Sequence, residues 1–201
     1  MKHLALLFLL VIVCVMNSCI GYYSDITHLT DDDLKWTDYY NVGDTIFFHS
    51  DNMENVDTMM VIDKRTYNRK NRFFIHYIDN YFGDRYEANS GYYYVIISGE
   101  NQIDGDFGIK KFIDCDSIFF SAYLGSLFTN GLKGFSNSYR PISTDSCNIN
   151  GDIYDNCIIV DDKNAHYIND SRIIDKFIIT QNYGLIYYRY TNGTEFFRKF
   201  D

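Results

Sequence analysis

This chain of 201 residues is long enough for one domain with a substantial core and short for two, so we expect a single domain. Its 19 Tyr and 16 Phe favour an all-β fold, because aromatic side chains pack well on pleated sheets. The formal net charge of −9 at pH 7 argues against nucleic acid as a partner and gives no electrostatic attraction to anionic lipid.

The N-terminal residues have the pattern of an export signal. Lys2 and His3 give a short basic start, residues 4–16 are an unbroken apolar run, and Asn17-Ser18-Cys19 closes it. The apolar run has the length of a signal-peptide core, about 7–15 residues, and is too short for the roughly 20 residues of a membrane-spanning helix. We therefore predict a signal peptide over residues 1–18.

The small residue directly before cysteine, in Ser18-Cys19, resembles the lipobox of bacterial lipoproteins, although Met16 stands where that family prefers leucine. In the family the peptide is cut before the cysteine, which then carries acyl chains such as palmitate. The resemblance implies lipid attachment at Cys19 and anchoring in the envelope of a Gram-negative cell, with the outer membrane as the expected location. The alternative is an ordinary secretory signal in which Cys19 falls near the cleavage point.

The segment after the cysteine is polar and has no apolar periodicity. It contains Asp31-Asp32-Asp33, which we interpret as part of a solvated linker. Residues 19–35 are thus predicted to be a lipidated flexible tether, and residues 36–201 a single β-domain that opens near Trp36.

Short apolar stretches separated by turn-forming residues follow Trp36. The expected strands cover residues 45–50, 58–63, 73–78, 92–98 and 117–124. Asn-, Asp- and Gly-rich segments, residues 98–108 among them, are interpreted as the separators. No window has a sustained helical period, so little helix is expected. Two of the stretches are apolar on both faces, which predicts a sandwich or a curved sheet that wraps around other groups.

The segment 130–150 contains the single proline and mostly turn formers, and we interpret it as a mobile or ligand-facing loop. Beyond Cys19 the chain has Cys115, Cys147 and Cys157, so at most one disulfide can form among these three. Unpaired thiols are the favoured interpretation, with a Cys147–Cys157 disulfide as the alternative.

The C-terminal residues predict four more strands, over residues 151–160, 171–180, 185–190 and 194–200. Asn192-Gly193 is a strong hairpin signal between the last two. This ending is similar to that of bacterial lipoproteins of unassigned function, through Tyr154, Gly184-Leu185-Ile186 and Asn192-Gly193. The resemblance implies an antiparallel meander and no chemistry. The layout also resembles, in topology alone, half-barrel lipid and lipoprotein carriers with an apolar groove.

One group of basic residues stands out on this acidic chain: Lys64, Arg65, Arg69, Lys70 and Arg72. Together they could bind an anionic glycan or the acidic patch of a partner, and the alternative is a solvated hairpin tip. Trp36, Tyr39-Tyr40 and Tyr187-Tyr188-Tyr190 could form platforms for sugar rings, or could pack in the core.

Chemical motifs are weak elsewhere. The histidines have no metal-ligand spacing, and acid pairs such as Asp104/Asp106 and Asp161/Asp162 are typical of turns. No cofactor, metal or catalytic residue is therefore predicted. We expect a lipid-anchored, non-catalytic binding module for a glycan or an envelope protein, with a lipid or lipoprotein carrier as the alternative and a hydrolase as a distant third.

Overall fold

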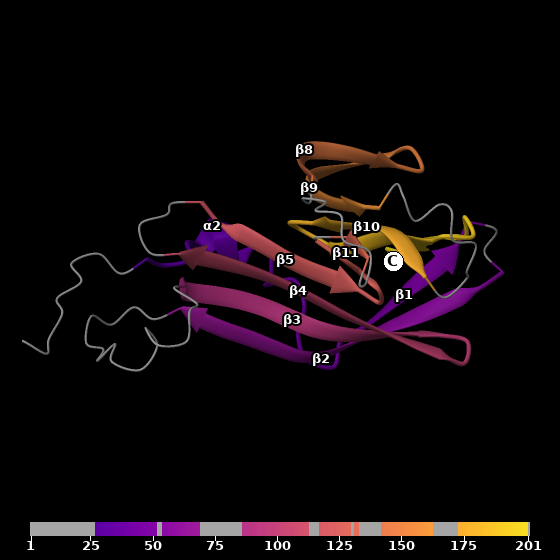
Figure 1. The fold of residues 1–201 in the computed structure, drawn as a ribbon, viewed down its shortest axis with the longest axis horizontal. Coiled ribbons are helices and arrows are strands. Elements are labelled where there is room, and N and C mark those ends of the chain that lie inside the picture. Colours follow the sequence, from indigo (N-terminus) through magenta and orange to yellow (C-terminus); the bar gives the residue numbers. More distant parts are fainter. Residues whose placement is uncertain are drawn as a thin grey trace, which may run out of the picture.

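The chain folds into one strongly curled antiparallel sheet with almost no helix (Figure 1). The computed structural model describes residues 27–51, 54–68, 86–112, 117–129, 131–132, 142–162 and 173–200. Within these residues, twelve strands form a single sheet in the order β7-β6-β5-β4-β3-β2-β1-β12-β11-β10-β9-β8. The all-β prediction is confirmed, in its half-barrel form.

The sheet consists of two meanders joined edge to edge. The first contains β1 (Thr45–Ser50), β2 (Val56–Asn68), β3 (Tyr86–Ser98), β4 (Asn101–Phe112), β5 (Phe119–Leu124), β6 (Leu127–Phe128) and β7 (Gly131–Leu132). The second contains β8 (Ile142–Ile149), β9 (Asp152–Asp161), β10 (Ile174–Thr180), β11 (Gly184–Tyr190) and β12 (Glu195–Arg198). Antiparallel pairing of β1 with β12 joins the two. The expected strand 73–78 lies outside the described residues.

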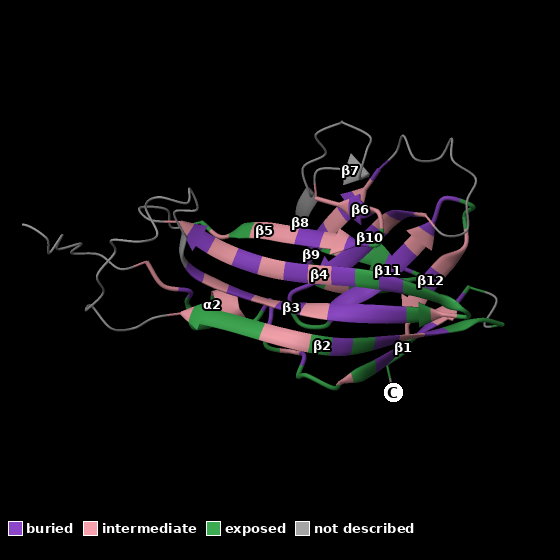
Figure 2. Ribbon diagram, turned by 60° about the horizontal axis from the view of Figure 1, so that its bottom comes forward, coloured by how far each residue is buried: buried purple, intermediate pink, exposed green. Residues whose placement is uncertain are grey.

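The interpretation of residues 98–108 as a separator is wrong, because most of this segment belongs to β4. Gly99, with a φ of 59°, makes the turn, and Ser98 pairs with Asn101 directly across it. Along β4, buried Ile103, Phe107 and Ile109 alternate with more exposed residues (Figure 2). The separating Asp and Gly residues gave this strand the composition of a turn, and only its alternation has the period of a strand.

The interpretation of residues 130–150 as one loop is wrong for its second half, which forms β8. Asn150 and Gly151 have φ values of 52° and 94° and connect the paired residues Ile149 and Asp152. Positive φ at both central residues is what a two-residue hairpin turn requires, and Asn-Gly supplies it with little strain. Residues 133–141 lie outside the described residues.

The turn at Asn192-Gly193 is confirmed, with a longer loop than a two-residue hairpin. The Gly193 N–H donates to the Tyr190 carbonyl at 2.9 Å, and the Tyr190 N–H donates to the Thr194 carbonyl at 3.0 Å. Gly193 has a φ of 90°. The loop is therefore three residues long and ends on a glycine in the left-handed conformation, a common hairpin form.

The inner face of the half-barrel is filled by its own side chains and by the residues that precede β1. Leu29 (4% exposed) and Trp36 (7% exposed) belong to the main hydrophobic cluster, and Leu34 packs against it. The short helix α2 (Asp31–Leu34) lies between them and begins with a capping box between Thr30 and Asp33.

Polar contacts tie this N-terminal segment to both meanders. The Asn68 side chain hydrogen-bonds both the N–H and the carbonyl of Leu29, and Lys111 Nζ lies 3.3 Å from Asp33 Oδ2. The Gln181 side chain donates to the Asp32 carbonyl at 3.1 Å. Residues 29–35, which the sequence pattern includes in a flexible tether, thus lie against the sheet, held there by buried Leu29 and by specific hydrogen bonds. Residues 19–26 lie outside the described residues.

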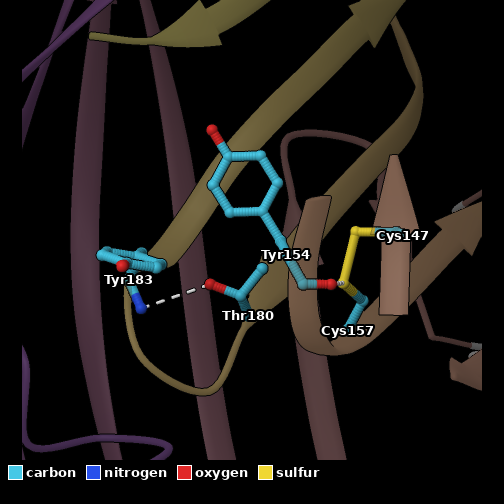
Figure 3. Close-up of a disulfide and its surroundings, with 5 residues drawn as sticks. All are labelled: Cys147, Tyr154, Cys157, Thr180 and Tyr183. Carbon is cyan, nitrogen blue, oxygen red and sulfur yellow. Dashed lines mark hydrogen bonds between the residues drawn. A yellow bond between two sulfur atoms is a disulfide. The ribbon is translucent and has the colours of Figure 1, made fainter. Parts of the chain in front are cut away.

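A disulfide joins the edge strand β8 to its neighbour β9. It links Cys147 to Cys157, with their Cα atoms 6.2 Å apart (Figure 3). The expectation of unpaired thiols is wrong for this pair, because the hairpin brings both residues within bonding reach. Cys115 lies outside the described residues. Among the described residues, no helix is long and apolar enough to cross a membrane.

Candidate functional site

The aromatic residues considered as sugar platforms are part of the core. Trp36 packs edge-on against Phe120, with ring centroids 4.8 Å apart, and also contacts Phe107. Tyr40, Tyr187, Tyr188 and Tyr190 are buried as well, and Tyr39 is partly buried. The idea that Trp36 offers an exposed ligand surface is wrong, because the curled sheet closes over it.

The basic residues do not form one joint site where the structure describes them. Successive residues on a strand point to opposite faces. Lys64 lies on the inner side, where its Nζ is 3.3 Å from Asp38 Oδ1, whereas Arg65 lies on the outer face and pairs with Asp63. Arg69, Lys70, Arg72 and the lipid-attachment candidate Cys19 lie outside the described residues.

The outer face of β2–β5 carries a regular grid of side chains. Pairing across the strands places residues of the same face in rows. The central row crosses strands β2 to β5 and contains, in this order, Arg65, Gly91, Gly108 and Ser121. The row on one side of it contains Asp63, Tyr93, Asp106 and Tyr123. The row on the other side contains Tyr67, Asn89, Lys110 and Phe119.

The glycine row forms a shallow depression in this face, with a volume of about 230 Å³. Gly91 and Gly108 pair directly across the strands, so bare backbone makes the floor. Its polar lining includes Asp63, Arg65, Asn89, Asp106, Lys110 and Ser121, and Tyr93 gives one aromatic wall.

Charges of both signs meet in the depression. Burial raises the pKa of the Asp106 carboxyl, and the positive charges of Arg65 and Lys110 lower it in part. Burial also raises the pKa of the Tyr123 hydroxyl, with a further contribution from Asp106 and Asp104. The lining contains two aspartates, Asp63 and Asp106, and two basic residues, Arg65 and Lys110. Their formal charges cancel.

An exposed apolar patch adjoins the depression on the same face of the sheet. We call it the outer apolar patch: Phe47, Val56, Met60, Ile62 and Ile97, each between 40% and 49% exposed. Phe47 lies opposite Thr58, which in turn lies opposite Ile97. Met60, Ile62 and Ile97 line a second hollow together with Tyr93, Val95 and Gln102. Tyr93 therefore borders both hollows.

The acid pairs do not gather into a metal site. Asp104 and Asp106 lie two residues apart on the outer face, and Asp161 pairs with Lys176, whose Nζ is 3.6 Å from its Oδ2. Among the described residues, no group of three or more His, Cys, Asp or Glu side chains is placed to hold a metal ion. The depression is not predictable from the sequence, because half of its floor and several of its polar side chains belong to β4, whose composition is that of a turn.

Comparisons with known proteins yield no relative. No family model matches the chain, and neither the curated proteins nor the solved structures contain a significant match. The geometry of the outer face is therefore the basis on which a function can be inferred.

Proposed function

We propose that this chain is a lipid-anchored, non-catalytic binding module of a bacterial cell envelope, and that it binds another protein through the outer apolar patch. One observation carries the proposal: five large apolar side chains on the neighbouring strands β1, β2 and β3 are at least 40% exposed. Scattered apolar residues are normal on a surface, but contiguous patches mark interaction sites.

The inner face, as far as the structure describes it, gives no support to a lipid carrier. A carrier needs an apolar cavity, and the inner face is packed with residues of its own chain, among them Leu29, Trp36, Tyr92 and Phe107. The exposed apolar surface lies on the opposite, outer side of the sheet. A protein surface of matching shape can cover such a patch without a cavity.

The border of the patch indicates what kind of protein fits. Asp104 lies directly opposite Val95. Asp63, which pairs with Arg65 in the free chain, lies one residue beyond Ile62. Two copies placed face to face would bring these acids together, and each chain already carries a net charge of −9. A partner with an apolar centre and a basic rim would bury the patch and complement the acids.

Photocrosslinking in the native cell tests this assignment. A crosslinking amino acid at position 60, in the full lipidated chain, should capture one defined partner, and the same group at Ile153 should not. Ile153 is a suitable control because it is 72% exposed on β9, in the other meander.

The purified pair then provides the quantitative test. Ile62→Glu should weaken binding at least about tenfold, because it introduces an unpaired charge into an apolar contact, while Ile153→Glu should leave affinity unchanged. Equal crosslinking from both positions, a crosslink only to a second copy of the chain, or full affinity in Ile62→Glu would each overturn the proposal.

A further inference from the structure

The packing of the sheet requires only one of the two glycines that form the floor of the depression. A Cβ on Gly91 would lie 2.7 Å from the Phe107 carbonyl oxygen and 3.0 Å from the Gly108 Cα, so close backbone packing demands glycine there. A Cβ on Gly108 would meet nothing nearer than the Ser90 carbonyl oxygen at 3.4 Å. Neither glycine has a positive φ. Gly108 therefore leaves open a space that a side chain could fill.

Glycine within a strand has a cost, because it weakens the strand and contributes no side chain to packing. It often marks a place where a ligand or another backbone approaches closely. The close approach of the β4 backbone explains why position 91 is a glycine. At Gly108 the open side faces the depression, which is lined mainly by polar side chains.

The polar groups around the floor include both donors and acceptors. Arg65 and Lys110 supply charged donors, Asn89 and Ser121 supply groups that donate and accept, and Asp106 supplies a partly buried carboxylate. They come from four neighbouring strands, which spread them over about 14 Å at the usual strand spacing. Such a set recognises a molecule with many hydroxyl groups along its length.

The balance of charge selects against ionic ligands. An anion attracted by Arg65 and Lys110 would also meet Asp63 and Asp106, and a cation attracted by the aspartates would meet the two basic residues. An uncharged polar ligand meets no such repulsion. Tyr93 adds an aromatic surface at the border, against which the apolar face of a sugar ring can pack.

We propose that the depression on the outer face of β2–β5 binds an uncharged saccharide, with one sugar ring on the Gly91–Gly108 floor and its hydroxyl groups hydrogen-bonded to Asp106, Arg65 and Asn89. The volume of about 230 Å³ is smaller than the ~300–1,000 Å³ of enclosed small-molecule sites, which suits one ring of a longer chain. A free amino acid, the competing neutral ligand, is normally enclosed by its site, and this depression is open. The inference is independent of the proposed protein partner, although Tyr93 borders both surfaces.

Calorimetry with the full chain in detergent tests the proposal. The probes are maltotriose, cellotriose, mannotriose and chitotriose as uncharged saccharides, a sulfated disaccharide as an anion, and free glycine as a zwitterion. At least one uncharged trisaccharide should bind. Gly108→Val, which fills the floor, should weaken that binding at least about tenfold. Thr45→Val, an apolar substitution on the outer face of β1 away from the depression, should bind as wild type.

A second variant avoids any change to the floor. Asp106→Asn keeps the shape of the side chain and removes a strong acceptor, so it should also weaken saccharide binding. Circular dichroism and the thermal midpoint show whether each variant is folded. The proposal is overturned if none of the uncharged trisaccharides binds, if the sulfated disaccharide or glycine binds more tightly, or if both folded variants bind as wild type. Loss of saccharide binding in Gly108→Val with an unchanged protein crosslink at position 60 would separate this site from the protein-binding patch.

Discussion

Asp57 is an unusual residue at the centre of this fold, because its carboxyl group is buried where β2 faces the core. It is 2% exposed, and it accepts a hydrogen bond from the hydroxyl of Tyr188 on β11. Burial raises the pKa of Asp57, and hydrogen bonds from Tyr188 and Ser98 lower it in part. Burial likewise raises the pKa of Tyr188, with the Asp57 charge as a second cause. This contact joins the two meanders through the core.

The raised pKa of Asp57 predicts a specific pH dependence of stability. Because the folded state holds this proton more tightly than the unfolded state, the associated stability is complete below the ordinary carboxyl pKa, 3.8. It is lost as pH rises through the raised folded value. Asp57→Asn keeps a hydrogen-bond acceptor and removes the charge, so its free energy of unfolding should improve relative to wild type as pH rises from acidic to neutral.

Urea unfolding of wild type and variant across this pH range measures the effect. Asp152→Asn, an exposed change in the β8–β9 hairpin, is the control for a lost surface carboxylate. A constant difference between wild type and Asp57→Asn at every pH would contradict the assignment.

Residue roles were the hardest feature to predict from the sequence, because aromatic residues look alike whether they are exposed or buried. Trp36 and Tyr188 could have formed a flat sugar-binding surface, and only the curl of the sheet shows that they are buried. Lys64 and Arg65 are neighbours in sequence but lie on opposite faces. Gly108 lies within Gly105-Asp106-Phe107-Gly108, whose composition is that of a turn. Its place in the grid depends on strand register, which one sequence does not determine.

At the scale of elements, the β8–β9 hairpin is held by both its turn and its disulfide. Asn150-Gly151 fixes the register, and the Cys147–Cys157 bond closes a loop with a sequence separation of 10. A loop of this size predicts that the disulfide contributes about 2–3 kcal/mol to the free energy of unfolding. Buried Cys157 also packs in the second hydrophobic cluster, with Ile178 and Tyr187.

Removal of this disulfide should therefore lower stability measurably. A Cys147→Ser/Cys157→Ser protein should lose about 2–3 kcal/mol in urea unfolding, and wild type should lose a similar amount in reductant. The double variant is its own control, because reductant should not destabilise it further. Equal stability of oxidised and reduced wild type would show that the bond does not contribute.

The segment before β1 gives a second test at this scale. If residues 29–35 belong to the domain, Leu29→Ala should cost about 2–5 kcal/mol, as buried leucines do. Val42→Ala, a change at a residue that is 61% exposed, should cost less than about 0.5 kcal/mol. The free energies of unfolding of the two variants decide the point. A wild-type value for Leu29→Ala would restore the interpretation of this segment as a tether.

Elements were predictable where a short apolar run was bounded by residues typical of turns, such as Gly or Asn. Strands β10 and β11 meet both conditions, whereas β8 does not, because its residues Ser143 to Asn148 are mostly polar. Helix α2 is a single turn, and its three aspartates resemble a linker. Its position depends on Leu29 and on contacts with Asn68, which are distant in sequence and could not be read from local pattern.

At the scale of the whole molecule, the sequence distance between the fold and the proposed point of attachment is short. Leu29, ten residues after Cys19, is already in the core. If Cys19 is acylated as proposed, this short distance holds the domain near the membrane.

Substitution of Cys19 tests the anchor directly. Cys19→Ala should release an intact domain from the membrane fraction or stall its processing, because the acyl chains would have no attachment atom. Cys14→Ala, a change within the predicted signal peptide, should leave the mature protein membrane-bound. Fractionation of cells and the intact mass of the product distinguish these results. A Cys19→Ala protein that matures and stays with the membrane would disprove lipid attachment at this residue.

The pairing of β1 with β12 has a consequence for how the protein is made. Each meander can form from neighbouring hairpins as soon as its residues are available. The sheet becomes continuous only when β1 pairs with β12, the last strand of the chain. Contacts between such distant parts of a chain form slowly. Until the C-terminal residues arrive, β1 keeps an open edge and the two halves of the core stay apart. If the chain crosses a membrane unfolded, as the predicted signal peptide implies, this order of assembly keeps the sheet open until the C-terminal strand has crossed.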